Sequence, residues 1–121
     1  MTARCSVSLF SGGGIGDLGI HYGCDVPIVA CAELLPDRVN LLKQFYPDAD
    51  VFGGDLRDTK DALIAAVRAR LRGKTPFLVT MSPPCQGFSS NGAGRISAAV
   101  KSGTRSAVDE RNRLVLSALD I

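Results

Sequence analysis

The chain has 121 residues, of which 45% are hydrophobic and 21% are charged. This length fits one domain, since a single hydrophobic core commonly occupies roughly 100–150 residues, and the composition excludes a disordered chain. A formal net charge of +2 is too small to indicate a polyanionic partner by itself. The apolar stretches at 27–32 and 76–81 are far shorter than the roughly 18–20 residues of a membrane helix. We therefore expect a soluble, cytoplasmic protein with no membrane partner.

The first half of the chain alternates short apolar runs with glycine-rich or amphipathic segments. Residues 5–10 form a mostly apolar run that leads directly into the glycine-rich segment 11–16, which predicts a strand followed by a tight loop. A short helix is expected over 17–22, closed by Gly23, and a second strand over 27–33. The acidic Glu33 then lies at the end of that strand.

A helix is predicted to open at Pro36-Asp37 and to stop at Tyr46-Pro47, with apolar residues at three-residue steps at Val39, Leu42 and Phe45. Proline is favoured in the first turn of a helix, and the Tyr46-Pro47 step ends the pattern because proline disfavours a helical residue before it.

A brief third strand is expected at 51–52, followed by a turn. Asp58 or Thr59 is the predicted N-cap of a third helix, and Gly73 lies beyond the end of that helix. The predicted buried face of that helix, at four-residue spacing, is Leu63, Val67 and Leu71.

The segment 76–81 predicts a fourth strand, and 109–121 resumes a helical pattern. Strands that alternate with helices indicate a parallel sheet joined by right-handed crossovers. Ligands bind such sheets beyond the C-terminal ends of the strands. The informative loops of this sequence all follow strands, so we expect a site at that edge.

The glycine loop predicts a nucleotide-type ligand, because glycines allow backbone N–H groups to approach a ligand closely. Gly14, Gly16 and Gly19 also match the dinucleotide fingerprint G-x-G-x-x-G, and Glu33 follows at about the distance of a ribose-binding acid. An NAD-dependent oxidoreductase is therefore an alternative. A carboxylate at Glu33 can accept hydrogen bonds from ribose hydroxyls, and Asp55 can accept one from an adenine amino group.

Four cysteines are present, with no C-x-x-C spacing, and His21 is the single histidine, so we expect no metal site. Cys5 and Cys31 lie in apolar segments and are expected to be buried. Cys85 differs, because it follows a strand and two prolines and precedes Gly87, a setting that holds one side chain in a defined position. A thiolate there would be a nucleophile, and the lack of a nearby histidine argues against a papain-like hydrolase.

The motifs occur together in the order found in cytosine-5 DNA methyltransferases, and the chain resembles the N-terminal part of that family's catalytic domain over nearly its whole length. The strongest motif is the segment around Cys85. The motifs are Phe10-Ser11-Gly12-Gly13-Gly14, Glu33, Gly54-Asp55-Leu56, Pro83-Pro84-Cys85-Gln86-Gly87-Phe88-Ser89 and Asp109-Glu110-Arg111-Asn112-Arg113-Leu114.

The resemblance implies the first half of a Rossmann-like methyltransferase fold, with a parallel sheet flanked by helices, and a role in DNA methylation and restriction-modification. It also implies an S-adenosylmethionine site and a cytosine flipped out of double-stranded DNA. Cys85 would add to C6 of that base, so that C5 can take the methyl group. The implied cofactor residues are Phe10, Ser11, Gly12, Gly13, Gly14, Glu33, Asp55, Leu56, Pro83, Asn112 and Leu114. The implied DNA residues are Pro84, Gln86, Gly87, Ser89 and Arg95.

The sequence departs from the family pattern at Ile15, where a glycine is usual, and at Ser8, where an aspartate is common. The family's cytosine-engaging glutamate and its target-recognition domain are not found in these residues. We therefore expect the chain alone to be inactive. It would be either a fragment or one subunit of a split enzyme that needs a complementing C-terminal chain or domain, in the cytoplasm or with the nucleoid if the source is bacterial. A non-catalytic domain that binds DNA or a partner is a further alternative.

Overall fold

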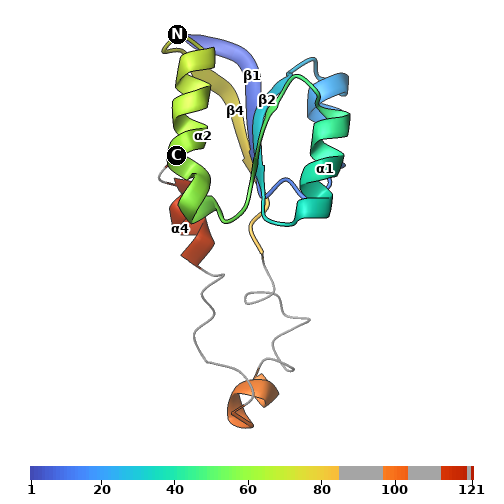
Figure 1. Cartoon of the computed structure of the whole chain (residues 1–121), viewed down its shortest axis with the longest axis vertical. Coiled ribbons are helices and arrows are strands. Elements are labelled where there is room, and N and C mark those ends of the chain that lie inside the picture. Colours follow the sequence, from blue (N-terminus) through green and yellow to red (C-terminus); the bar gives the residue numbers. More distant parts are fainter. Residues whose placement is uncertain (85–96, 104–112, 120) are drawn as a thin grey trace.

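The structure is a computed structural model that describes residues 1–84, 97–103, 113–119 and 121. Its strands and helices alternate along the chain (Figure 1). In order they are β1 (Thr2–Leu9), η1 (Gly19–Gly23), β2 (Ile28–Glu33), α1 (Pro36–Phe45), β3 (Asp50–Gly53), α2 (Leu56–Arg70), β4 (Thr75–Met81) and α4 (Leu114–Leu119). Residues 97–101 add one helical segment.

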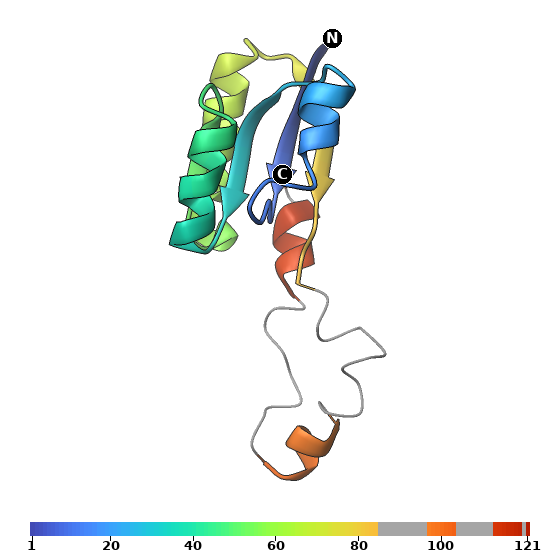
Figure 2. The same ribbon diagram turned by 90° about the vertical axis from the view of Figure 1, so that its right-hand side faces the viewer.

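The four strands form one parallel sheet in the order β3-β2-β1-β4. Helices α2 and α4 lie on one face of the sheet, and α1 and η1 lie on the other, as two perpendicular views show (Figures 1 and 2). The predicted α/β class and parallel sheet are confirmed. Because all strands run the same way, their C-terminal ends share one edge of the sheet, and the loops that follow them meet there.

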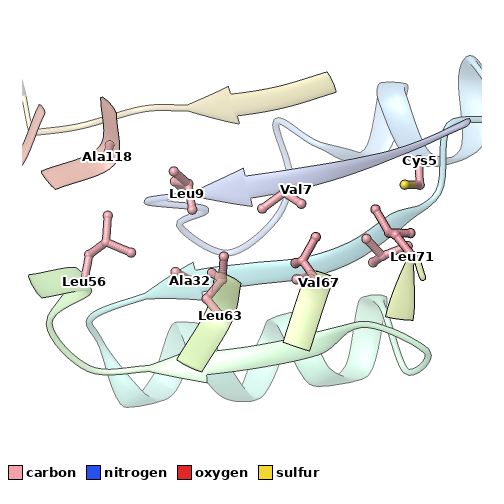
Figure 3. Packing of buried hydrophobic residues seen from close by; sticks show 11 residues of the cluster. Cys5, Val7, Leu9, Ala32, Leu56, Leu63, Val67, Leu71 and Ala118 are labelled. Atoms are coloured by element: carbon pink, nitrogen blue, oxygen red, sulfur yellow. The ribbon is translucent and has the colours of Figure 1, made fainter. Parts of the chain in front are cut away.

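The main hydrophobic core lies between the sheet and α2 (Figure 3). The predicted face of α2 supplies Leu63, Val67 and Leu71, all buried, which pack against Val7 and Leu9 of β1. β1 is buried from Cys5 onward and β2 throughout, as expected for parallel strands covered on both faces. A smaller core joins α1 to the opposite face.

Two predicted helix starts are wrong. The segment expected to be helical from residue 17 forms turns first, and η1 is a single π-helical turn from Gly19 to Gly23. α2 starts earlier than expected, because Asp55 and not Asp58 or Thr59 is its N-cap, with its side chain accepting a hydrogen bond from the Arg57 N–H. An N-cap aspartate satisfies an otherwise unpaired N–H of the first turn.

The three apolar residues that recur at three-residue steps in α1 are not all buried. Val39 and Leu42 are buried, but Phe45 is 38% exposed and Tyr46, just beyond the helix, is 1% exposed. The helix ends before Pro47 as expected, and the change of backbone direction at Tyr46 turns that ring inward instead of Phe45.

Strand β4 is an edge strand within the described part of the chain, with β1 on one side. Its burial alternates, and Phe77, Val79 and Met81 on one face are 64%, 41% and 36% exposed. Among the described residues, no helix combines the length and apolarity needed to cross a bilayer.

Candidate functional site

A cavity of about 410 Å³ lies at the C-terminal edge of the sheet, where the segments after the four strands meet. This volume is within the range of about 300–1,000 Å³ found for small-molecule sites. Several residues predicted from the sequence line it together, although they come from different strands and helices. Those residues are Phe10, Glu33, Asp55, Leu56, Pro84 and Leu114.

The glycine loop borders this edge of the sheet and packs against α1 and Tyr46, the residue that follows it. The Tyr46 hydroxyl donates to the Gly14 carbonyl at 2.5 Å, and burial raises the pKa of Tyr46 to about 12, so this donor stays protonated at neutral pH. Gly14 has φ +80°, and a Cβ there would lie 2.7 Å from the Tyr46 ring and 2.8 Å from Leu42. Ser11, Gly12, Gly13 and Gly14 are outside the cavity lining itself.

Phe10 turns the chain out of β1 into this loop. It has φ +55°, a left-handed backbone conformation that is uncommon for a residue with a bulky side chain. Such strain is concentrated at functional sites. The bend sends the glycine loop toward α1 and leaves the Phe10 ring at the cavity, partly packed against the main core.

Glu33 is 7% exposed at the end of β2, and each of its carboxylate oxygens already accepts a backbone hydrogen bond. Oε2 accepts from the Gly12 N–H at 2.7 Å, and Oε1 accepts from the Leu35 N–H at 3.1 Å. Sequence reasoning missed this role. A carboxylate oxygen has a second lone pair, so Glu33 retains capacity for a ligand hydroxyl while it joins the glycine loop to the loop after β2.

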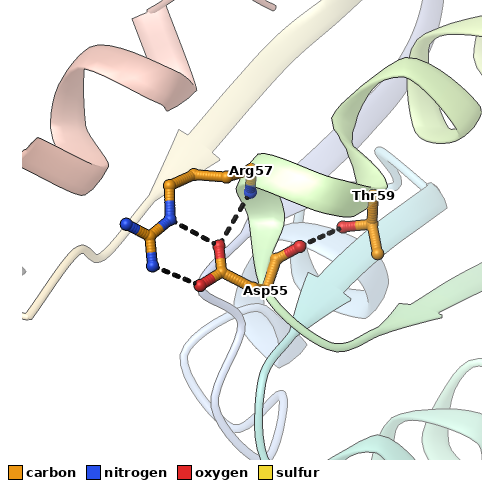
Figure 4. A network of polar contacts seen from close by, with 3 residues as sticks. All are labelled: Asp55, Arg57 and Thr59. Atoms are coloured by element: carbon orange, nitrogen blue, oxygen red, sulfur yellow. Dashed lines mark hydrogen bonds and ion pairs between the residues drawn. The ribbon is translucent and has the colours of Figure 1, made fainter.

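Asp55 combines a helix cap with an ion pair at the cavity wall (Figure 4). Its Oδ1 accepts from the Arg57 backbone N–H at 2.9 Å and from Nε at 3.0 Å, and its Oδ2 accepts from Nη2 at 2.6 Å. The Thr59 hydroxyl donates to the Asp55 carbonyl at 3.1 Å. The side-chain and backbone hydrogen bonds from Arg57 lower the pKa of Asp55 below its ordinary value, so the carboxylate is ionised at neutral pH.

The cavity also contains residues that sequence reasoning did not select. Leu34 and Leu35 are 59% and 45% exposed although both are apolar, which is typical of a ligand-binding wall. Arg38, in the first turn of α1, adds a cation. The sequence held one signal for Leu34 and Leu35, because two leucines stand between an acid at the end of a strand and a proline at the start of a helix. The remaining unpredicted lining residues are Ala32, Gly54 and Ser82.

The start of the predicted nucleophile segment reaches the same cavity. After β4 ends at Met81, the Ser82 N–H donates to the Leu9 carbonyl at 3.2 Å, which keeps the segment beside β1. Ser82 and Pro84 line the cavity, and Pro83 lies between them. The other predicted site residues fall outside the described residues, namely Cys85, Gln86, Gly87, Ser89, Arg95 and Asn112.

A family model described as C-5 cytosine-specific DNA methylase matches residues 5–121. The chain belongs to this family. It is also 33% identical over 111 residues to the type II methyltransferase M1.HgaI of Avibacterium volantium, which covers 91% of the chain and 28% of that protein. It is 36% identical over 83 residues to the type II methyltransferase M.AquIA of a Picosynechococcus species, covering 69% of the chain and 33% of that protein. The chain thus spans about a third or less of these relatives.

Membership in the methylase family confirms the resemblance derived from the motifs and removes support from the oxidoreductase alternative. The structure adds a physical reason. In a dinucleotide fold, the glycine fingerprint opens a helix whose N-terminus faces the pyrophosphate. Here the third fingerprint glycine, Gly19, starts the single turn η1, which is too short to present the N-terminal dipole of a full helix.

Proposed function

We propose that this chain supplies the S-adenosylmethionine pocket and the nucleophile of a DNA cytosine-5 methyltransferase. The observation that carries the proposal is the cavity at the strand ends, because it brings Phe10, Glu33 and Asp55 beside the segment that leads into Cys85. The family match over residues 5–121 supports the same chemistry.

The lining of the cavity fits the adenosyl part of the cofactor. Phe10, Leu35 and Leu56 offer apolar walls for a purine ring, which suits a flat aromatic group. Glu33 would accept from the ribose hydroxyls with its free lone pairs, and Asp55 would accept from the adenine amino group. For Asp55 to do so, the bound ligand must share the carboxylate with Arg57 or displace it.

When bound, S-adenosylmethionine supplies an electrophilic methyl group. The Cys85 thiolate adds to C6 of the flipped cytosine, which makes C5 nucleophilic toward that methyl group. Once C5 has taken the methyl group, with S-adenosylhomocysteine as the leaving group, a base such as water would remove the C5 proton. The electrons of the C5–H bond would then expel the thiolate from C6 and restore the aromatic base. The residues of this chain hold the reacting groups in position and keep the thiolate near the methyl donor.

Double-stranded DNA is the proposed substrate, and we propose that methyl transfer requires polypeptide beyond these residues. The chain spans 28% and 33% of the two relatives, and edge strand β4 exposes the apolar side chains of Phe77 and Val79. A complementing chain or domain that covers β4 would bury this face. Pro84 and, in the segment outside the described residues, Gln86, Gly87, Ser89 and Arg95 are the proposed DNA contacts.

The cofactor part of the proposal is tested by calorimetric titration of the chain with S-adenosylhomocysteine and, separately, with NADH. We expect binding of the first and not of the second. Glu33→Gln should weaken binding about tenfold or more, because a charged hydrogen-bond acceptor is lost. Asp61→Asn, an exposed change on α2, is the control. Binding of NADH alone, or equal affinity of Glu33→Gln, would contradict the proposal.

The nucleophile part is tested with DNA containing 5-fluorocytosine, in the presence of S-adenosylmethionine and the complementing polypeptide. Fluorine at C5 cannot leave as a proton does, so an adduct between the thiolate and the base should accumulate and be seen by denaturing electrophoresis. Cys85→Ser should abolish it, whereas Cys24→Ser, at an exposed cysteine, should retain it. An adduct that survives Cys85→Ser would refute the mechanism.

A further inference from the structure

We infer that Asp17 is a positioning residue that ties the glycine loop to the C-terminal end of β4, and so sets the cofactor pocket against the strand that leads into Cys85. The inference rests on the proposed function. Asp17 lies in the loop between β1 and η1, is 7% exposed, and receives hydrogen bonds from two strands.

The contacts of Asp17 come from neighbouring positions of β1 and β4. The Ser8 hydroxyl donates to Oδ2 at 2.7 Å, and the Thr80 hydroxyl donates to Oδ1 at 3.3 Å. Ser8 and Thr80 are register partners in the sheet, so both hydroxyls emerge side by side on one face. The two carboxylate oxygens of Asp17 bridge them, which joins β1 and the loop after it to β4, whose Thr80 is 63 residues from Asp17 in the sequence.

The bridge extends into the glycine loop itself. The Ser11 hydroxyl donates to the Ser8 hydroxyl at 2.9 Å and to the Ser8 carbonyl at 3.0 Å. The Asp17 N–H donates to the Gly14 carbonyl at 3.2 Å, the same carbonyl that Tyr46 holds. Asp17 is therefore linked to both ends of the loop, to Gly14 directly and to Ser11 through Ser8. Ser8 thus links the two, because its hydroxyl accepts from Ser11 and donates to the Asp17 carboxylate.

Burial of a carboxylate is costly unless hydrogen bonds compensate. Among the described residues, hydroxyl groups and not a cation supply that compensation at Asp17. The Asp17 carboxylate also affects a neighbouring thiol. Burial, and after it the Asp17 carboxylate, raises the pKa of Cys31 to about 12. An apolar residue at position 17 would fill the space but would form no hydrogen bonds to hold the glycine loop in place. A buried carboxylate between two strands therefore fits a role in fixing the position of that loop.

The position of Thr80 connects this bridge to the proposed cofactor pocket. Thr80 is one residue before the end of β4, and Ser82 and Pro84, just beyond it, line the cavity. Neither Thr80 nor Asp17 lines the cavity. Substitution of Thr80 should therefore affect a bound ligand indirectly, through the bridge to the glycine loop.

The test compares Thr80→Val and Asp17→Asn with Thr80→Ser, which keeps the hydroxyl. Thr75→Val is the matched control at the other end of β4, where no side-chain hydrogen bond is found within the described residues. Amide hydrogen exchange is measured in the ligand-free chain for residues 11–18 and for α2. Loss of one hydrogen bond should raise exchange in 11–18 about threefold or more in Thr80→Val and Asp17→Asn, with α2 unchanged. Thr80→Ser and Thr75→Val should match the parent.

A merely structural role predicts a different result, because general destabilisation raises exchange in α2 as well. Equal exchange in 11–18 for Thr80→Val and the parent would overturn the inference, as would a rise spread over the whole chain. Since Thr80→Val preserves shape, it also decides the matter if Asp17→Asn fails to fold.

The second readout is affinity for S-adenosylhomocysteine, which should fall about threefold or more in Thr80→Val and recover in Thr80→Ser. A faster-exchanging loop with unchanged affinity would overturn the link to the pocket. If the parent chain binds no S-adenosylhomocysteine, the proposed function fails and the link to its pocket fails with it, while hydrogen exchange still decides whether the bridge exists.

Discussion

Gly14 illustrates how a single residue in the candidate site can have a structural reason that its motif does not reveal. The sequence pattern indicates a glycine that lets the backbone approach a ligand. In the structure Gly14 instead packs tightly against α1, since a Cβ would lie 2.7 Å from Tyr46 and 2.8 Å from Leu42. The positive φ of +80° adds a second restriction. A requirement for glycine at this position is therefore expected on packing grounds alone, before any ligand is considered.

Gly14→Ala should lower the free energy of unfolding by about 1–3 kcal/mol, because the added methyl group must displace buried side chains and adopt a strained φ. Gly16→Ala is the matched control, since a Cβ there meets nothing within 4 Å. Urea unfolding followed by circular dichroism measures both. Equal stability of Gly14→Ala and Gly16→Ala would contradict the close packing of the loop on α1.

At the scale of the element, the start of α2 shows how capping joins stability to the site. Sequence reasoning placed the cap at Asp58 or Thr59, because both are good capping residues near an apolar pattern. In the structure the N-cap is Asp55, three residues earlier, and its carboxylate also forms an ion pair with Arg57. The helix therefore begins at the cavity wall, and its first turn carries a predicted ligand-binding residue.

Asp55→Asn should lower stability at pH 7 by about 0.5–1 kcal/mol, since asparagine still caps but loses the partly exposed ion pair. The folded-state pKa of Asp55 is lowered, so its contribution is full above the ordinary value of 3.8. It falls as the pH drops below that value, and it is lost below the folded-state pKa. The two proteins should thus converge in stability in acid.

Urea unfolding at pH 7 and in an acid series measures this difference. Asp58→Asn is the control, because it removes the same charge from the same helical turn and leaves the Asp55–Arg57 pair in place. A constant difference between Asp55→Asn and the parent at every pH would show that the ion pair does not carry the effect.

At the scale of the whole molecule, the exposed edge strand β4 dominates the expected behaviour in solution. The central strands are buried, β1 from Cys5 onward and β2 throughout, while edge strand β4 exposes Phe77 and Val79 on one face. Exposed apolar edge strands favour pairing with another chain. In the proposed enzyme the complementing polypeptide would cover this face, and in its absence a second copy can do so.

Phe77→Lys should therefore weaken self-association of the chain about tenfold or more, since burial of an aromatic side chain contributes about 1.5–3 kcal/mol. Folding stability should change little, because Phe77 is 64% exposed. Ile15→Lys, at an apolar residue 75% exposed in the glycine loop, is the control for loss of apolar surface elsewhere. Sedimentation velocity over a concentration series reports the difference, and unchanged association of Phe77→Lys would exclude β4 as the contact.

The sequence by itself determined the class of the fold, the succession of strands and helices and the edge of the sheet where the candidate cavity lies. These features depend on local patterns, since apolar periodicity, glycine and proline act within a few residues of the chain. The motifs were sufficient to identify the methylase family, which the family match confirms. They also selected Phe10, Glu33 and Asp55, which the structure brings to one cavity.

Only the tertiary structure decided which groups those residues contact. It turned Tyr46 inward under Gly14, gave both oxygens of Glu33 to backbone N–H groups, and set Asp17 between Ser8 and Thr80. The contacts of Tyr46 with Gly14, of Glu33 with Gly12 and of Asp17 with Thr80 join segments separated along the chain. They depend on the packing angle between a loop and the elements that it contacts. A local pattern carries no information about that angle, because it is set by how the layers fit together.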